Sequence, residues 1–178
     1  MRKYLIVFAA ALGLCLTSVA QADISVSVEP AGKIVNLGDT FTLDLVADIP
    51  DTDPTLGWGL DLVIDLPGVI SVVGSPVLGS SWDPPAESGD GDGLAGFVFP
   101  DGIWGDDILL ATVTFHADAY GGTSVCPDYT IGDENEGFAL DPTGFATLIL
   151  NCGYVTVIPE PGTIALFMLG AAALLRRK

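Results

Sequence analysis

Residues 41–48 read Phe-Thr-Leu-Asp-Leu-Val-Ala-Asp, an alternation of apolar and polar side chains. A repeat of two places Phe41, Leu43, Leu45 and Ala47 on one face of an extended chain. The opposite face carries hydroxyl and carboxylate groups. The stretch therefore predicts a β-strand with one face in a core and the other in water.

The same alternation recurs along the chain. In residues 58–65 the inward row begins at Trp58, and in residues 111–118 it contains Val113 and Phe115. A further inward row is predicted from Ala146 through Leu148 and Leu150 to Cys152. Shorter strands are expected at residues 24–28, 33–35, 69–73, 94–99 and 124–125.

Turns rich in Gly, Pro and Asp separate these runs, and no segment between residues 23 and 157 has a capped helical repeat. Many short strands with such turns are typical of sandwiches and barrels. We therefore expect an all-β fold: a single antiparallel β-sandwich of about nine strands over residues 23–157.

Residues 1–22 have the pattern of a secretory signal peptide. Arg2 and Lys3 precede an uncharged apolar run, and Ala20-Gln21-Ala22 is a small-x-small cleavage pattern. We expect the mature chain to begin at Asp23. The alternative is an N-terminal membrane anchor, for which the apolar run is short.

The C-terminal segment, residues 158–178, contains Pro159, Glu160 and Pro161, then an apolar run and three basic residues. This order resembles the PEP-CTERM sorting signal of Gram-negative bacteria. The resemblance implies that exosortase, a membrane enzyme with a Cys nucleophile, recognises the Pro-Glu-Pro triplet and cuts near it. The apolar run predicts a short transmembrane helix whose basic end stays cytoplasmic. The alternative is an ordinary C-terminal anchor.

The body also resembles cohesin-type domains, which are nine-stranded jelly rolls related to carbohydrate-binding modules. The resemblance rests on the patterning of residues 38–45, 57–65 and 108–115. It implies the jelly-roll fold.

The charge of the body limits the classes of molecule that it is expected to bind. The chain has 178 residues and a formal net charge of −17, but residues 23–158 hold 22 acidic residues and one basic residue, a net of −21. Nucleic acids and anionic surfaces attract basic patches, so we expect no nucleic-acid partner.

Cys126 and Cys152 are the only cysteines outside the signal peptide. An exported domain folds in an oxidising compartment, so one disulfide between them is predicted.

The acid-rich segment 83–107 is a candidate calcium site. Its tentative ligands are Asp90, Asp92, Asp101, Asp106 and Asp107, interleaved with glycines. Calcium takes six to eight oxygen ligands, which Gly-rich turns can bring together. The alternative is a solvated acidic loop without a specific ion. No other cofactor is indicated.

Trp82 and Trp104 bracket this segment and are candidates for an exposed platform that stacks on sugars; the alternative is a role in the core or as loop anchors. His116 is the only histidine and is expected on a solvated sheet face beside Asp118. The chain has no GxSxG or HExxH motif, so no catalytic residues are predicted and a hydrolase is the least favoured class.

The sequence thus predicts a non-enzymatic protein. It would cross the inner membrane of a Gram-negative bacterium, be anchored transiently and then serve at the cell surface or in the extracellular matrix. The alternatives are a carbohydrate-binding or calcium-dependent adhesion module, and an extracellular polysaccharide is a candidate partner.

Overall fold

The computed structural model describes residues 23–84, 94–133, 135–142 and 144–160, with Gly162 and Leu169. The predicted signal peptide and most of the predicted C-terminal transmembrane helix lie outside this part and stay predictions. Among the residues described, no helix has the length and hydropathy that crossing a membrane requires.

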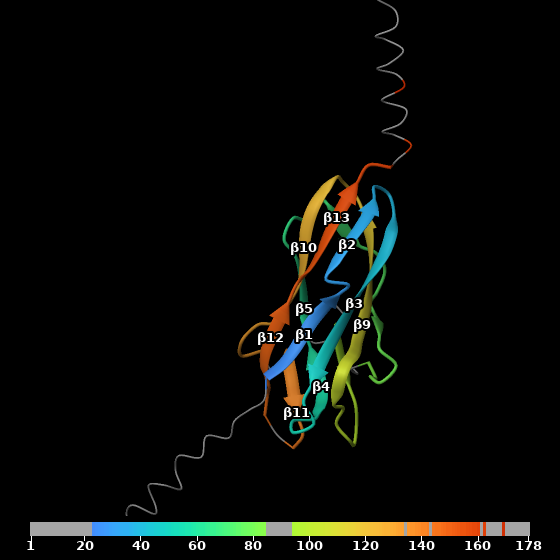
Figure 1. Cartoon of the computed structure of the whole chain (residues 1–178). Helices are drawn as coiled ribbons and strands as arrows, with labels where there is room; N and C mark the ends of the chain where they lie inside the picture. The colour runs from blue at the N-terminus through green and yellow to red at the C-terminus, as the bar shows by residue number, and fades with distance from the viewer. Residues whose placement is uncertain are drawn as a thin grey trace, which may run out of the picture.

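One layer of the fold is a six-stranded sheet, sheet A (Figure 1). Its strand order is β12-β1-β3-β9-β6, and β7 also pairs with β9. The bounds are β1 Asp23–Glu29, β3 Thr40–Ile49, β6 Ile70–Val72, β7 Val77–Leu78, β9 Gly105–Ala117 and β12 Thr147–Asn151.

The other layer contains two smaller sheets, which follow one another along the sandwich. Sheet B has the order β2-β13-β10-β5, with β2 Gly32–Asn36, β5 Asp61–Ile64, β10 Gly121–Asp128 and β13 Gly153–Ile158. Sheet C has the order β11-β4-β8, with β4 Thr55–Gly59, β8 Ala95–Phe97 and β11 Gly137–Leu140. Leu60, which is fully buried, joins β4 to β5, so the predicted single strand over residues 58–65 is two strands in two sheets.

The inward rows meet in one hydrophobic core. Phe41 of β3 stacks on Phe115 of β9 with ring centroids 5.7 Å apart. Trp58 of β4 is buried as predicted, and its ring contacts Trp82 edge-on at 6.2 Å. Alternation in the sequence therefore identified the faces of β3, β4 and β9 correctly.

The sandwich is not purely antiparallel, which corrects one expectation. β1 pairs in parallel with β12, and β2 pairs in parallel with β13. Parallel strands need a long connection between them, and here the rest of the domain is that connection. The first two strands thus lie beside the last two, β1 beside β12 and β2 beside β13 (Figure 1).

The N-terminal and C-terminal chain segments that form these pairs cross from sheet A to sheet B at the same level of the sandwich. The chain leaves sheet A after Glu29 and enters sheet B at Gly32, while its C-terminal part crosses between Asn151 and Gly153. The Tyr154 amide donates to the Ala31 carbonyl oxygen at 2.9 Å, which ties the two crossings together. The placement of Cys152 on an inward row was therefore wrong: it lies at the crossing and is exposed.

Gly59 marks a close approach of backbone to backbone. A Cβ atom at this position would lie 2.1 Å from the Asn135 carbonyl oxygen, because the loop before β11 crosses the outer face of β4 there. Gly57, two residues earlier on the same face, would meet its nearest neighbour, the Gly96 carbonyl oxygen, at 3.4 Å.

We therefore predict that Gly59→Ala destabilises the domain by about 1–3 kcal/mol, because the loop must move, while Gly57→Ala changes stability much less. Urea unfolding of both variants checks this. Equal stabilities for the two variants would show that the loop does not pack on β4.

Candidate binding surface

The outer face of sheet B carries a group of exposed apolar side chains. In the β10–β13 register Ser124 is opposite Tyr154 and Gly122 is opposite Thr156. Thr156 is in turn opposite Ile34 of β2, and Cys126 is opposite Val63 of β5. Exposed large apolar side chains on this face are Ile34, Val63, Tyr154 and Ile158. We call these residues, with the disulfide among them, the sheet B patch.

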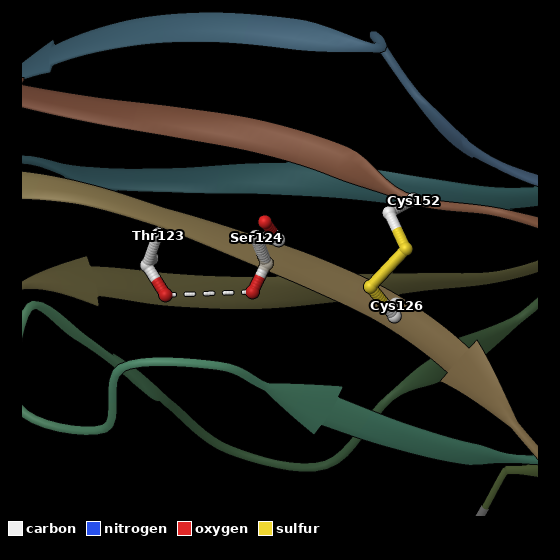
Figure 2. The surroundings of a disulfide bond; sticks show 4 residues. All are labelled: Thr123, Ser124, Cys126 and Cys152. Carbon is white, nitrogen blue, oxygen red and sulfur yellow. Dashed lines mark hydrogen bonds between the residues drawn. A yellow bond between two sulfur atoms is a disulfide. The ribbon is translucent and has the colours of Figure 1, made fainter.

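The predicted disulfide between Cys126 and Cys152 is present, with an S–S distance of 2.06 Å (Figure 2). It continues the β10–β13 pairing by one step beyond Val125 and Gly153, with a Cα–Cα distance of 4.2 Å. That distance is typical of a directly opposed pair without backbone hydrogen bonds. The disulfide therefore joins β10 to the crossing between β12 and β13.

Neighbouring polar groups hold β10 in place. The Thr123 side chain is buried, and its hydroxyl accepts a hydrogen bond from the Leu66 amide at 3.0 Å. The same hydroxyl donates to the Ser124 carbonyl oxygen at 3.4 Å (Figure 2). Gly122 leaves room for the Tyr154 ring, since a Cβ there would lie 2.0 Å from the Tyr154 hydroxyl. The patch is thus a defined arrangement of side chains on paired strands.

The outer face of sheet A differs in chemistry. It carries Ser, Thr, Asp and Asn side chains that bond to one another. Thr112 donates to Asp44 at 2.6 Å, and the Asn151 amide donates to Ser25 and Ser27. These named polar groups already have partners within the sheet, which favours the sheet B patch for a docking protein.

His116 lies where the alternation placed it, on the outer face of sheet A. Its ring Nδ1 is 2.8 Å from an Asp118 carboxylate oxygen. This hydrogen bond, with a smaller effect from Ser71, lowers the pKa of the Asp118 carboxyl below its ordinary value. Both side chains are substantially exposed, and the geometry is that of a surface pair.

The two candidate platform residues are not equivalent. Trp82 is buried, and its indole N–H donates to the Leu109 carbonyl oxygen at 3.0 Å. Of the two alternatives for Trp82, the structure shows the core role and not an exposed platform, because its ring packs edge-on against Trp58. Trp104 is 60% exposed, so only one of the two candidate platform residues lies at the surface.

The candidate calcium ligands are only partly described. Asp90 and Asp92 lie outside the described residues, and calcium binding there stays a prediction. Asp101 is exposed in a loop, whereas Asp106 and Asp107 are exposed within β9. The Asp107 amide donates to an Asp48 carboxylate oxygen at 2.9 Å. Across the described ranges, no three His, Cys, Asp or Glu side chains converge as metal ligands do.

At the other end of β13, the strand stops at Ile158, and Pro159 follows directly. Residues 157–178 match the PEP-CTERM protein-sorting motif. The PEP-CTERM motif implies export and sorting to the cell envelope of Gram-negative bacteria, with processing by exosortase. No curated protein sequence matches the chain.

Solved cohesin modules share the backbone arrangement of the body. The seventh ScaB type I cohesin from Pseudobacteroides cellulosolvens is 11% identical, with a TM-score of 0.55 over 78% of this chain and 94% of that one. The third ScaB cohesin of R. flavefaciens, solved in complex with a group 1 dockerin, is 13% identical, with a TM-score of 0.54 over 80% and 99%. A non-cellulosomal cohesin from Archaeoglobus fulgidus is 14% identical, with a TM-score of 0.51 over 81% and 97%. The body of the chain has a cohesin-like fold.

Sequence reasoning missed the sheet B patch. It did not predict β13, although Gly153, Val155 and Val157 alternate with Tyr154, Thr156 and Ile158. That alternation is the signal that identifies Tyr154 as an outward residue.

Proposed function

We propose that this chain is an exported, non-enzymatic module that exosortase releases from the inner membrane and that binds a protein at the cell surface or in the extracellular matrix. The observation that carries the proposal is a cohesin-like sandwich followed directly by a PEP-CTERM motif. The R. flavefaciens cohesin is a relative in fold whose partner in the solved complex is a protein, a dockerin. By this likeness, we favour a protein partner over a polysaccharide.

The chemistry of the surface supports the same choice. Flat sugar-binding platforms need adjacent exposed aromatic rings, and the burial of Trp82 removes one of the two candidates. The sheet B patch instead offers Tyr154 and aliphatic side chains on an ordered sheet, the composition of a protein-docking surface. Asp61, Asp65 and Asp128 border it, so a partner with apolar anchors and basic residues at its rim would be complementary.

The first prediction concerns cleavage of the C-terminal segment by exosortase. In a host with exosortase, mass spectrometry of the mature protein should find a C-terminus near Glu160. Replacing Pro159, Glu160 and Pro161 by alanine should leave the C-terminal segment attached. A wild-type product that retains Arg176–Lys178 in such a host would contradict the sorting step.

The docking face has a separate test. A photo-crosslinking amino acid at Tyr154, which is 52% exposed, should capture a protein partner in living cells. The matched control is the same amino acid at Ile149, which is 49% exposed on the outer face of sheet A. Equal yields at both positions, or none at Tyr154, would contradict docking on the sheet B patch.

A further inference from the structure

β2 is an edge strand of sheet B, paired with β13 on one side only. The hydrogen bond from the Tyr154 amide to the Ala31 carbonyl oxygen begins this parallel ladder, and the bond from the Leu37 amide to the Ile158 carbonyl oxygen ends it. In a parallel pair, residues that direct both backbone groups to the partner strand alternate with residues that direct both away. Because Ala31 and Leu37 bond to the C-terminal segment, the odd-numbered residues of β2 face β13 and the even-numbered residues face outward.

The three outward-facing residues differ in what their backbone groups contact. The Asn36 amide donates to an Asp39 carboxylate oxygen at 2.9 Å, and the Asn36 carbonyl oxygen accepts from the Asp39 amide at 3.1 Å. Among the described residues, the N–H and C=O groups of Gly32 and Ile34 have no backbone partner. These two residues therefore present unpaired donors and acceptors at the edge of the sheet.

The space beside Gly32 and Ile34 is open. The Ile34 side chain is 71% exposed, and a Cβ atom at Gly32 would meet no described atom within 4 Å apart from its chain neighbours. After the turn at residues 36–39, β2 and β3 diverge into sheets B and A, so β3 does not pair with this edge. An additional strand therefore has room to approach β2.

Lys33, the only Lys or Arg between residues 23 and 158, does not protect this edge. A lysine on an edge strand commonly prevents pairing with another chain. Here its Nζ donates to the Thr42 carbonyl oxygen of β3 at 3.0 Å and lies 5.9 Å from the centre of the Phe41 ring. The ammonium group is thus directed toward sheet A, and β2 carries no other charged residue.

We propose that the protein partner of the sheet B patch adds an extended segment to β2 as a further strand of sheet B. Only an extended segment can bond to both Gly32 and Ile34, because a helix has unpaired backbone groups at its ends alone. Since Gly32 is opposite Tyr154, the added strand would continue the patch, with apolar side chains of the partner beside Ile34. This inference rests on the proposed protein partner and specifies how that partner binds.

Proline and alanine substitutions separate backbone bonding from side-chain contact. Ile34→Pro removes the outward N–H and places a ring at the edge, whereas Ile34→Ala removes the same side chain and keeps the N–H. Each variant carries the photo-crosslinking amino acid at Tyr154, on the strand next to β2. Ile34→Pro should lower the yield of cross-linked partner about tenfold relative to Ile34→Ala, because it deletes a hydrogen bond and blocks the approaching strand.

Urea unfolding of the purified variants is the control for folding. Because the Ile34 N–H has no partner within the described domain, Ile34→Pro and Ile34→Ala should unfold at similar urea concentrations. Gly32→Pro and Gly32→Ala form a second pair, which is read in the same way. Failure of both proline variants to fold would show that the domain itself needs these N–H groups, and would overturn the proposal.

The remaining outcomes separate this proposal from the proposed function. Equal yields from the proline and alanine variants would overturn strand addition and leave docking on the sheet B patch intact. A cross-linked product that contains two copies of this chain would also overturn it, because the occupant would then be a second copy. If the crosslinker at Tyr154 captures nothing when Ile34 and Gly32 are unchanged, both the proposal and the proposed docking are overturned.

Discussion

The first two strands of this domain pair in parallel with the last two, β1 with β12 in sheet A and β2 with β13 in sheet B. Both chain segments cross from sheet A to sheet B at one level. At the crossing, the Tyr154 amide bonds to the Ala31 carbonyl oxygen, and the Cys126–Cys152 disulfide ties the C-terminal strand to β10. A change of sheet alters which side chains face the core. Leu148 and Leu150 pack inward from β12, whereas Tyr154 beyond the crossing points outward from β13.

The surfaces with proposed functions follow from this crossing. Because β13 joins β10 in sheet B, Tyr154 lies beside Ser124, and the disulfide lies at the end of the sheet B patch that is next to the crossing. Because β13 then continues beside β2 to Ile158, the PEP-CTERM motif follows directly where this strand ends. The proposed docking face and the position of the sorting motif are thus both set by the path of one strand.

The sequence was informative where a strand keeps one face in the core over its whole length. Alternation identified the buried faces around Phe41, Trp58 and Phe115, and the Pro-Glu-Pro triplet with its apolar run identified the sorting motif. It failed where tertiary pairing decides the outcome. The row ending at Cys152 continues by periodicity, but the chain changes sheet there. Trp82 lies beside an acidic loop in sequence, yet its ring fills the core against Trp58. The start of β9 contains Asp106 and Asp107, whose charges conceal a strand that pairing with β3 stabilises.

Equilibrium urea unfolding of the Cys126→Ser/Cys152→Ser double variant tests most directly whether the crossing holds the domain together. The disulfide joins residues 26 apart in sequence, and its loss should lower the free energy of unfolding by about 3 kcal/mol, since the unfolded chain regains the entropy of an open loop. Wild-type protein unfolded under reducing conditions should show the same loss. A double variant as stable as the oxidised wild type would contradict the account, because the crossing would then need no covalent link to β10.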